Sequence, residues 1–96
     1  MAQINVSLLS IDPNADPQQF QVEVVGEDNS KTTHNVSLSK DLYVKLTGGL
    51  KSSEELVKAS FEFLLEREPK ESILPSFDLS EIQKYYPEYE TLISAN

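Results

Sequence analysis

The fold is decided by residues 53–68, SEELVKASFEFLLERE. Ser52 and Glu55 have the spacing of a capping box, which predicts that a helix begins here. At 100° per residue, its apolar and small side chains cover about 240° of the circumference, wider than the stripe of an ordinary surface helix. These side chains are Leu56, Val57, Ala59, Ser60, Phe61, Phe63, Leu64 and Leu65. We therefore expect a central helix that is covered on two or three sides.

A strand-rich segment precedes this helix. Apolar and polar residues alternate over residues 3–9, 20–24 and 32–38, which predicts three strands. Turn-forming residues separate these strands, and strands joined in this way usually form an antiparallel meander. A short helix that begins after Ser39 is expected to end at Gly48, because glycine accepts the left-handed conformation that ends helices.

Several short helices are predicted after the central one. Pro69 stops the central helix and can start a short helix that runs to about Leu74. Residues 78–81 resemble a second capping box, and residues 88–94 make a last turn or two. Such pieces are too short to be stable alone, so we expect them to dock on the central helix.

The predicted fold class is α+β. It consists of a three-stranded antiparallel sheet, then a central amphipathic helix and several short C-terminal helices. We expect a single domain over residues 1–96, strand-rich over 1–38 and helix-rich over 39–96. A three-stranded sheet has two open edges, so a homodimer built by sheet pairing or by an apolar helix surface is as consistent with the sequence as a monomer.

The charge of the chain disfavours some classes of partner. Sixteen acidic residues face eight basic ones, giving a net charge of -8, and the basic residues are scattered. This balance disfavours direct binding of nucleic acid or anionic lipid. An acidic balance also keeps a protein soluble. A more specific interpretation is that the chain binds a basic protein partner.

Location is also constrained by composition. No apolar stretch approaches the ~20 residues that cross a bilayer, so we expect no membrane contact. Residues 1–6 lack the basic and apolar regions of a signal peptide, and cysteine is absent. We therefore expect a cytoplasmic protein.

The helix-rich half contains three distinctive segments. They are SFEFLLEREPKESIL at residues 60–74, FDLSEI at 77–82 and YYPEYE at 85–90. Together they resemble a family of small acidic bacterial proteins of unknown function, over roughly residues 47–90. The resemblance implies a free-standing bacterial cytoplasmic protein, and it brings no activity, cofactor or catalytic residue.

One spacing resembles a calcium loop. Asp12, Asn14, Asp16 and Glu23 fall at its first, third, fifth and twelfth positions. The sixth position needs glycine for a sharp turn, and Pro17 stands there instead. We interpret the segment as a turn in which Asp and Asn bond their own backbone, and we predict neither a metal nor another cofactor.

His34 is the only histidine. It shares strand parity with Val36 and Leu38, which predicts a half-buried structural residue near the end of the sheet. The chain has no cysteine and no nucleophile elbow around a serine, so we predict no catalytic residue. A small enzyme or small-ligand binder that uses His34 and nearby carboxylates is an alternative, and it needs a pocket that holds both.

A group of aromatic residues is the last feature that could indicate an interaction surface. Tyr85, Tyr86 and Tyr89 lie within five residues, and Phe61 and Phe63 occupy the wide apolar face. Tyrosine is favoured in interfaces because it combines a large area with a polar tip, although these rings can equally pack the C-terminal helices. The leading hypothesis is a non-catalytic protein–protein interaction or regulatory module that uses these five residues. A third hypothesis, a nucleic-acid-associated regulator, needs a basic face.

Overall fold

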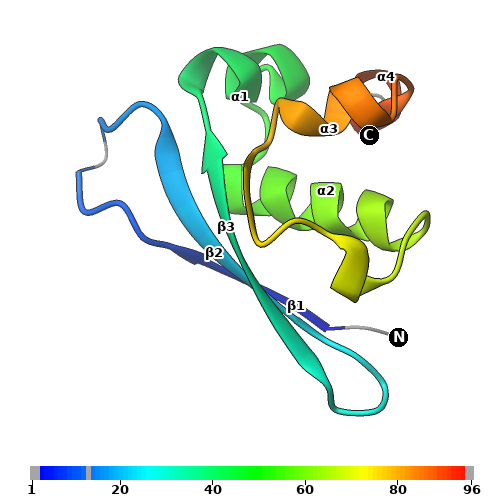
Figure 1. Cartoon of the computed structure of the whole chain (residues 1–96). Helices are drawn as coiled ribbons and strands as arrows, with labels where there is room; N and C mark the ends of the chain where they lie inside the picture. Colours follow the sequence, from blue (N-terminus) through cyan, green and yellow to red (C-terminus); the bar gives the residue numbers. More distant parts are fainter. Residues whose placement is uncertain (1–2, 13, 95–96) are drawn as a thin grey trace.

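The fold has two layers, a sheet and a set of helices that covers one of its faces (Figure 1). The computed structural model describes residues 3–12 and 14–94. The strands are β1 (Gln3–Leu8), β2 (Gln18–Val25), β3 (Lys31–Leu38) and β4 (Ser76–Asp78). The helices are α1 (Lys40–Thr47), α2 (Ser53–Leu65), the 3₁₀ turn η1 (Lys70–Ser72), α3 (Glu81–Tyr85) and α4 (Tyr89–Ser94). The predicted α+β class is confirmed.

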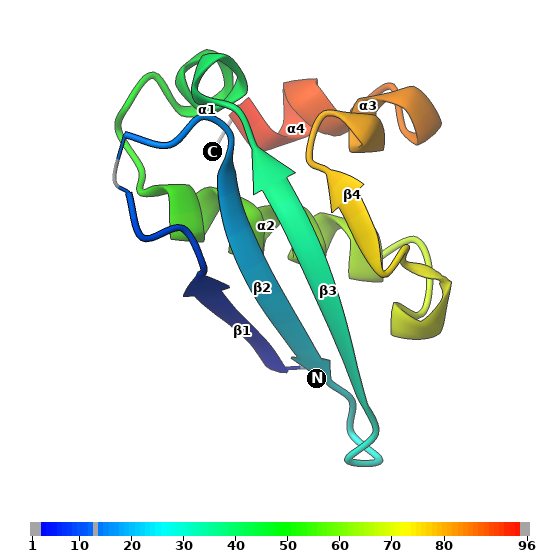
Figure 2. The same cartoon turned by 60° about the vertical axis from the view of Figure 1, so that its left-hand side comes forward.

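The sheet differs from the prediction in one strand. Its order is β1-β2-β3-β4, and β1, β2 and β3 form the expected antiparallel meander. β4 adds a fourth strand parallel to β3 (Figure 2), so the predicted three-stranded antiparallel sheet is corrected to a four-stranded mixed one. The sequence did not predict β4 because three residues are too few to show an alternating pattern. Its partner strand β3 also lies about forty residues earlier in the chain.

The two faces of the sheet carry different side chains. The face toward the helices is mostly apolar, and its buried apolar members on β2 and β3 are Phe20, Val22, Val24, Val36 and Leu38. The register places Val22 opposite His34 and Phe20 opposite Val36, so these side chains share that face. The opposite face carries polar residues such as Gln21 and Asn35, which are exposed. The sheet therefore has one buried face, as the alternation predicted.

The central position of α2 is confirmed. The amide of Glu55 donates to the Ser52 hydroxyl at 3.1 Å and the Ser52 amide donates to the Glu55 carboxylate at 3.3 Å, which completes the predicted capping box. Phe61 is 0% exposed and meets the sheet side of the core, while Phe63 is 6% exposed and meets α4. The helix ends at Leu65, earlier than the predicted residue 68.

The short helices follow the predicted order with different details. Ser39 caps α1 and Gly48 ends it at φ 63°, as predicted. The predicted helix after Pro69 is only the 3₁₀ turn η1. Before α3, the amide of Ser80 donates to the Asp78 carboxylate at 3.0 Å in place of the predicted capping box. Within the described residues, no helix is long and apolar enough to cross a membrane.

Candidate functional site

A groove of about 230 Å³ lies between the end of α2, the segment around η1 and α3. We call it the C-terminal groove. Its buried floor is apolar and consists of Leu64, Ile73, Phe77 and Ile82. Its rim consists of Glu68, Ser72, Leu74, Glu81, Tyr85 and Tyr86. Leu74 is 47% exposed and Tyr85 is 69% exposed, so two large apolar groups of the rim face solvent.

The strand β4 fixes the floor of the groove to the sheet. The amide of Asn35 donates to the Pro75 carbonyl at 2.8 Å, and the amide of Leu79 donates to the Ser37 carbonyl at 2.8 Å. These bonds hold both ends of β4, and Phe77 between them points into the core, 6.0 Å from the Phe61 ring. The groove therefore exists because a short segment joins the sheet edge.

Asp78 strengthens the same attachment. Its carboxylate accepts a hydrogen bond from the Ser37 hydroxyl at 2.6 Å and others from the amide and hydroxyl of Ser80. Burial raises the pKa of Asp78, but the hydrogen bonds from Ser37 and Ser80 outweigh it and hold the pKa below its usual value. The carboxylate is thus kept ionised as a bridge between β3 and the start of α3.

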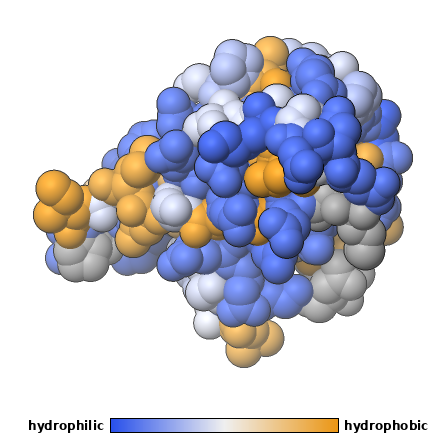
Figure 3. Space-filling model, turned by 90° about the horizontal axis from the view of Figure 1, so that it is seen from below, coloured by the Kyte–Doolittle hydropathy of each residue, from blue (hydrophilic) through white to orange (hydrophobic). Residues whose placement is uncertain are grey.

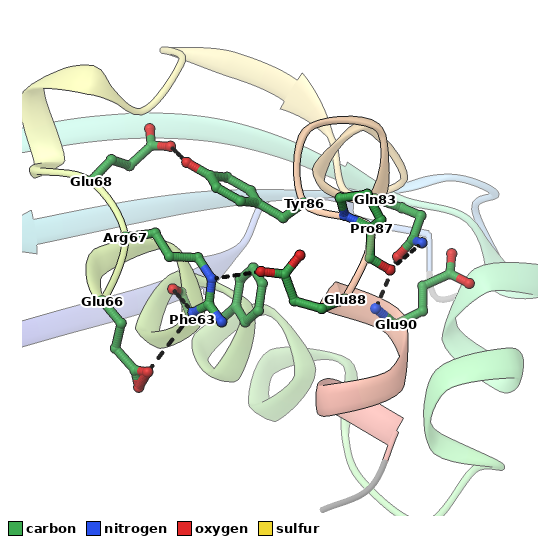
Figure 4. Close-up of polar contacts among 9 residues, drawn as sticks. All are labelled: Phe63, Glu66, Arg67, Glu68, Gln83, Tyr86, Pro87, Glu88 and Glu90. Carbon is green, nitrogen blue, oxygen red and sulfur yellow. Dashed lines mark hydrogen bonds and ion pairs between the residues drawn. The ribbon is translucent and has the colours of Figure 1, made fainter.

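The groove is closed on one side by Tyr86. Its hydroxyl donates a hydrogen bond to the Glu68 carboxylate, which joins the end of α3 to the segment after α2 (Figure 4). This hydrogen bond to an anion raises the pKa of Tyr86. The Tyr86 ring meets Phe63 edge-on at a centroid distance of 5.8 Å. Both contacts hold the wall formed by α3.

The side chain of Arg67 makes several contacts within the chain beside this wall. Its guanidinium lies 3.6 Å above the centre of the Phe63 ring and donates to the Phe63 carbonyl at 3.0 Å. The same group pairs with Glu88 at 3.4 Å and with Glu66 at 3.9 Å (Figure 4). Among the residues that the structure describes, Glu68 is one of two charged side chains that line the groove, and both are acidic.

Three of the five predicted surface residues are core residues. Phe61, Phe63 and Tyr89 are at most 6% exposed, so they pack α2 between the sheet and α4. The Tyr89 hydroxyl lies 2.6 Å from Ser60 Oγ, and burial raises its pKa to about 12. The prediction of one exposed surface made of all five residues is therefore corrected, because the wide apolar face of α2 is covered within the chain itself.

The other two predicted residues meet at the groove. Tyr85 is exposed and Tyr86 is half-buried, and both line the rim. Adjacent helical residues point in different directions, so only Tyr86 reaches the core aromatics. Two members of the tyrosine cluster therefore lie at one wall of the groove.

His34 is more deeply buried than predicted, at 2% exposure. Its Nδ1 lies 2.8 Å from the Leu74 carbonyl, which can only accept, so Nδ1 donates. Nε2 lies 2.8 Å from the Thr32 hydroxyl, within hydrogen-bond distance. The ring also contacts Phe61 at a centroid distance of 5.4 Å. Both ring nitrogens are occupied and neither partner is a carboxylate, so His34 connects the sheet to the rim residue Leu74.

The calcium-like spacing is not one site in this fold. The Asn14 amide donates to the Asp12 carboxylate at 2.9 Å, as a turn of this composition predicts. Asp16 accepts from the Lys40 amide at the start of α1, and Glu23 pairs with Lys31 on the sheet. Over residues 3–12 and 14–94, no group of three or more acidic or histidine side chains could hold a metal ion.

A second groove, of about 540 Å³, lies between the loop after β1 and the starts of α1 and α2. Three of its polar side chains already serve the fold. The Ser39 hydroxyl caps α1, the Ser52 hydroxyl caps α2, and the Tyr43 hydroxyl donates to the Lys51 carbonyl. They are therefore engaged within the chain, as Tyr86 and Glu68 are in the C-terminal groove. The C-terminal groove is the better candidate because the exposed side chains of Leu74 and Tyr85 stand at its rim above a buried apolar floor.

No protein-family model, curated protein or solved structure matches the chain. The resemblance over residues 47–90 to a family of small bacterial proteins therefore stays a prediction. The floor of the C-terminal groove includes Ile73 and Phe77. The sequence analysis assigned neither residue to a site, because the groove arises from the position of β4 and not from a local pattern.

Proposed function

We propose that the chain is a non-catalytic interaction module whose C-terminal groove binds a short basic segment of a protein partner. One or two large apolar side chains of that segment anchor it on the floor, and its lysines or arginines pair with the rim. The observation that carries the proposal is the combination of an apolar floor with a rim whose charged members, among the described residues, are Glu68 and Glu81.

The size of the groove favours side-chain anchors. A volume of about 230 Å³ is below the roughly 300–1,000 Å³ of sites that enclose drug-sized ligands. Peptide segments instead place single apolar residues in such grooves and leave their flanks at the rim. Leu74 and Tyr85 supply exposed apolar contact at that rim, and tyrosine is enriched at such contacts.

The charge around the groove selects the flanks of the partner. Residues 66–90 carry seven acidic side chains and three basic ones. Two of the basic ones are engaged locally, since Arg67 pairs with Glu88 and Lys70 with Glu71. The local field is therefore negative, which attracts a basic segment and repels phosphate-bearing surfaces.

A selection experiment tests this proposal. A displayed library of random peptides is enriched on the immobilised chain and, in parallel, on Leu74→Glu with Tyr85→Ala. We expect the wild-type chain to enrich peptides that combine Leu, Phe, Trp or Met with flanking Lys or Arg, and the variant to lose them. Enrichment of acidic peptides, no enrichment, or equal enrichment on the variant would refute the groove as the binding site.

A further inference from the structure

The first strand leaves one edge of the sheet open. β1 is the terminal strand, and no other segment of the described residues pairs with its outer side. The Leu9 amide donates to the Gln19 carbonyl at 2.8 Å, which fixes the alternation along the strand. The backbone groups of Ile4, Val6 and Leu8 therefore point away from β2, because residues of an antiparallel strand alternate between the two sides.

This edge lacks the usual protection. Natural edge strands carry lysine, proline, a bulge or an inward charge that prevents pairing. Residues 1–11 contain no charged residue and no proline, and they form the longest uncharged run of a chain in which 25% of residues are charged. Apolar side chains are also exposed at the end of β1, with Leu8 and Leu9 each 47% exposed and Ile11 fully exposed. Figure 3 shows apolar atoms at the end of the molecule where the loop after β1 lies.

We propose that β1 pairs antiparallel with β1 of a second copy, so that two four-stranded sheets join into one across a two-fold axis. The register that fits places Val6 opposite Val6 of the second copy and Ile4 opposite Leu8 of the second copy. These are the residues whose backbone groups face outward, so each pair exchanges two hydrogen bonds.

The side chains are complementary in this register. Ile4 and Val6 are half-buried and Leu8 is half-exposed on the core side, so the pairing covers apolar surface that one chain leaves open. On the other face Asn5 meets Ser7 of the second copy. Every pair is free of like charges, which would oppose pairing if they stood directly across from each other.

A second copy fits this edge better than the basic partner of the groove. Two chains of net charge -8 repel each other wherever their charged faces meet, and the uncharged run is where they can approach. The strand offers no carboxylate that would select a lysine or arginine. The dimer surface is therefore separate from the C-terminal groove, and each can be lost without the other.

The test is a pair of charge variants at exposed positions, measured by light scattering and sedimentation from about 10 μM to about 1 mM, a range that reports dissociation constants up to the millimolar level. Asn5→Lys with Ser7→Lys places two lysine pairs across the interface. Asn5→Lys with Ser7→Glu places two lysine–glutamate pairs there. Both side chains lie on the exposed face, opposite Glu23 and Gln21 of β2, so the fold tolerates the changes, and circular dichroism checks this.

We expect the wild-type mass to rise from 10.8 kDa toward twice that value with concentration. The double-lysine variant should dissociate about tenfold more easily, although it makes each copy less negative. The lysine–glutamate variant should dimerise like the wild type. A wild-type mass that stays at 10.8 kDa up to 1 mM, or a dimer equally stable in both variants, overturns the proposal.

Discussion

The hydroxyl of Tyr86 donates a hydrogen bond to the carboxylate of Glu68, and this bond joins two walls of the C-terminal groove. The Phe63 ring contacts the Tyr86 ring from the core side and so supports the wall formed by α3. The groove is therefore formed by contacts within the chain before a partner binds, which lowers the ordering cost of binding. The rim carboxylates of Glu68 and Glu81 are both half-buried, and the proposed basic segment pairs with them there.

Neutralising a carboxylate at the rim of the groove should weaken the binding of the partner. We expect Glu81→Gln to reduce the affinity of a selected basic peptide by a factor between about 1.4 and about 5, since exposed ion pairs contribute about 0.2–1 kcal/mol. The affinity should also fall with added salt. Fluorescence anisotropy measures both effects. Glu62→Gln is the matched control because Glu62 lies on the exposed side of α2, and an equal loss in that variant would contradict a role for the rim.

Removing the imidazole of His34 should destabilise the contact between the sheet and the rim residue Leu74. His34→Leu fills the position with an apolar side chain of moderate size but leaves the part-buried Leu74 carbonyl without its donor. We expect a loss of roughly 1–3 kcal/mol in the free energy of unfolding, measured with urea. Thr33→Ala, an exposed change on the same strand, should cost much less. A stability equal to that control would mean that the two bonds of the imidazole do not hold the rim.

The Ser37–Asp78 bond should hold β4 in place. Ser37→Ala removes a donor to an ionised acceptor, and we expect a loss of about 1 kcal/mol at neutral pH. Ser7→Ala, on the exposed face of β1, should be close to neutral. Because folding lowers the pKa of Asp78, its stabilisation is present above the ordinary carboxyl pKa and is lost as pH falls through the lower folded value.

Urea unfolding of both chains between pH 7 and pH 2 measures this dependence. The difference in unfolding free energy between the wild type and Ser37→Ala should shrink at the acid end, where Asp78 is protonated. A difference that stays constant with pH would show that the serine acts without the carboxylate.

Tyr89 should make the fold sensitive to alkali. Burial raises its pKa to about 12, so the folded chain keeps the proton that the unfolded chain loses near pH 10. The stabilisation is complete below pH 10 and is lost as pH rises through the folded value, by about 2 kcal/mol at pH 12. Tyr89→Phe should remove this part of the slope.

Exposed Tyr85→Phe is the control for that experiment, because its ring lies largely in solvent. Urea unfolding between pH 8 and pH 12 measures the slopes. If Tyr89→Phe retains the full alkaline slope of the wild type, the hydroxyl beside Ser60 is not the group that resists ionisation.

The sequence predicted the elements that depend on local signals. The capping box of Ser52 and Glu55, the glycine end of α1 and the three alternating strands each need only neighbouring residues, and all are present. The breadth of the apolar face of α2 also predicted that Phe61 would be covered, and it is.

The site was harder to predict because it depends on distant contacts. β4 has one buried residue, Phe77, and its position is set by bonds to a strand about forty residues away. Part of the tyrosine cluster lies at the rim of the groove, but its periodicity could not tell that Tyr89 would be buried and Tyr85 exposed. A short docked segment has a choice of faces that only the tertiary contacts decide.

The central claim is that a basic, apolar-anchored segment occupies the C-terminal groove. Its most direct test is a nuclear magnetic resonance titration of the full chain with the tightest peptide from the selection. We predict that the resonances of Ile73, Leu74, Ile82 and Tyr85 shift together with one affinity, while those of β1 and the outer sheet face stay in place. Shifts confined to other surfaces, with the groove resonances unmoved at saturation, would contradict the account.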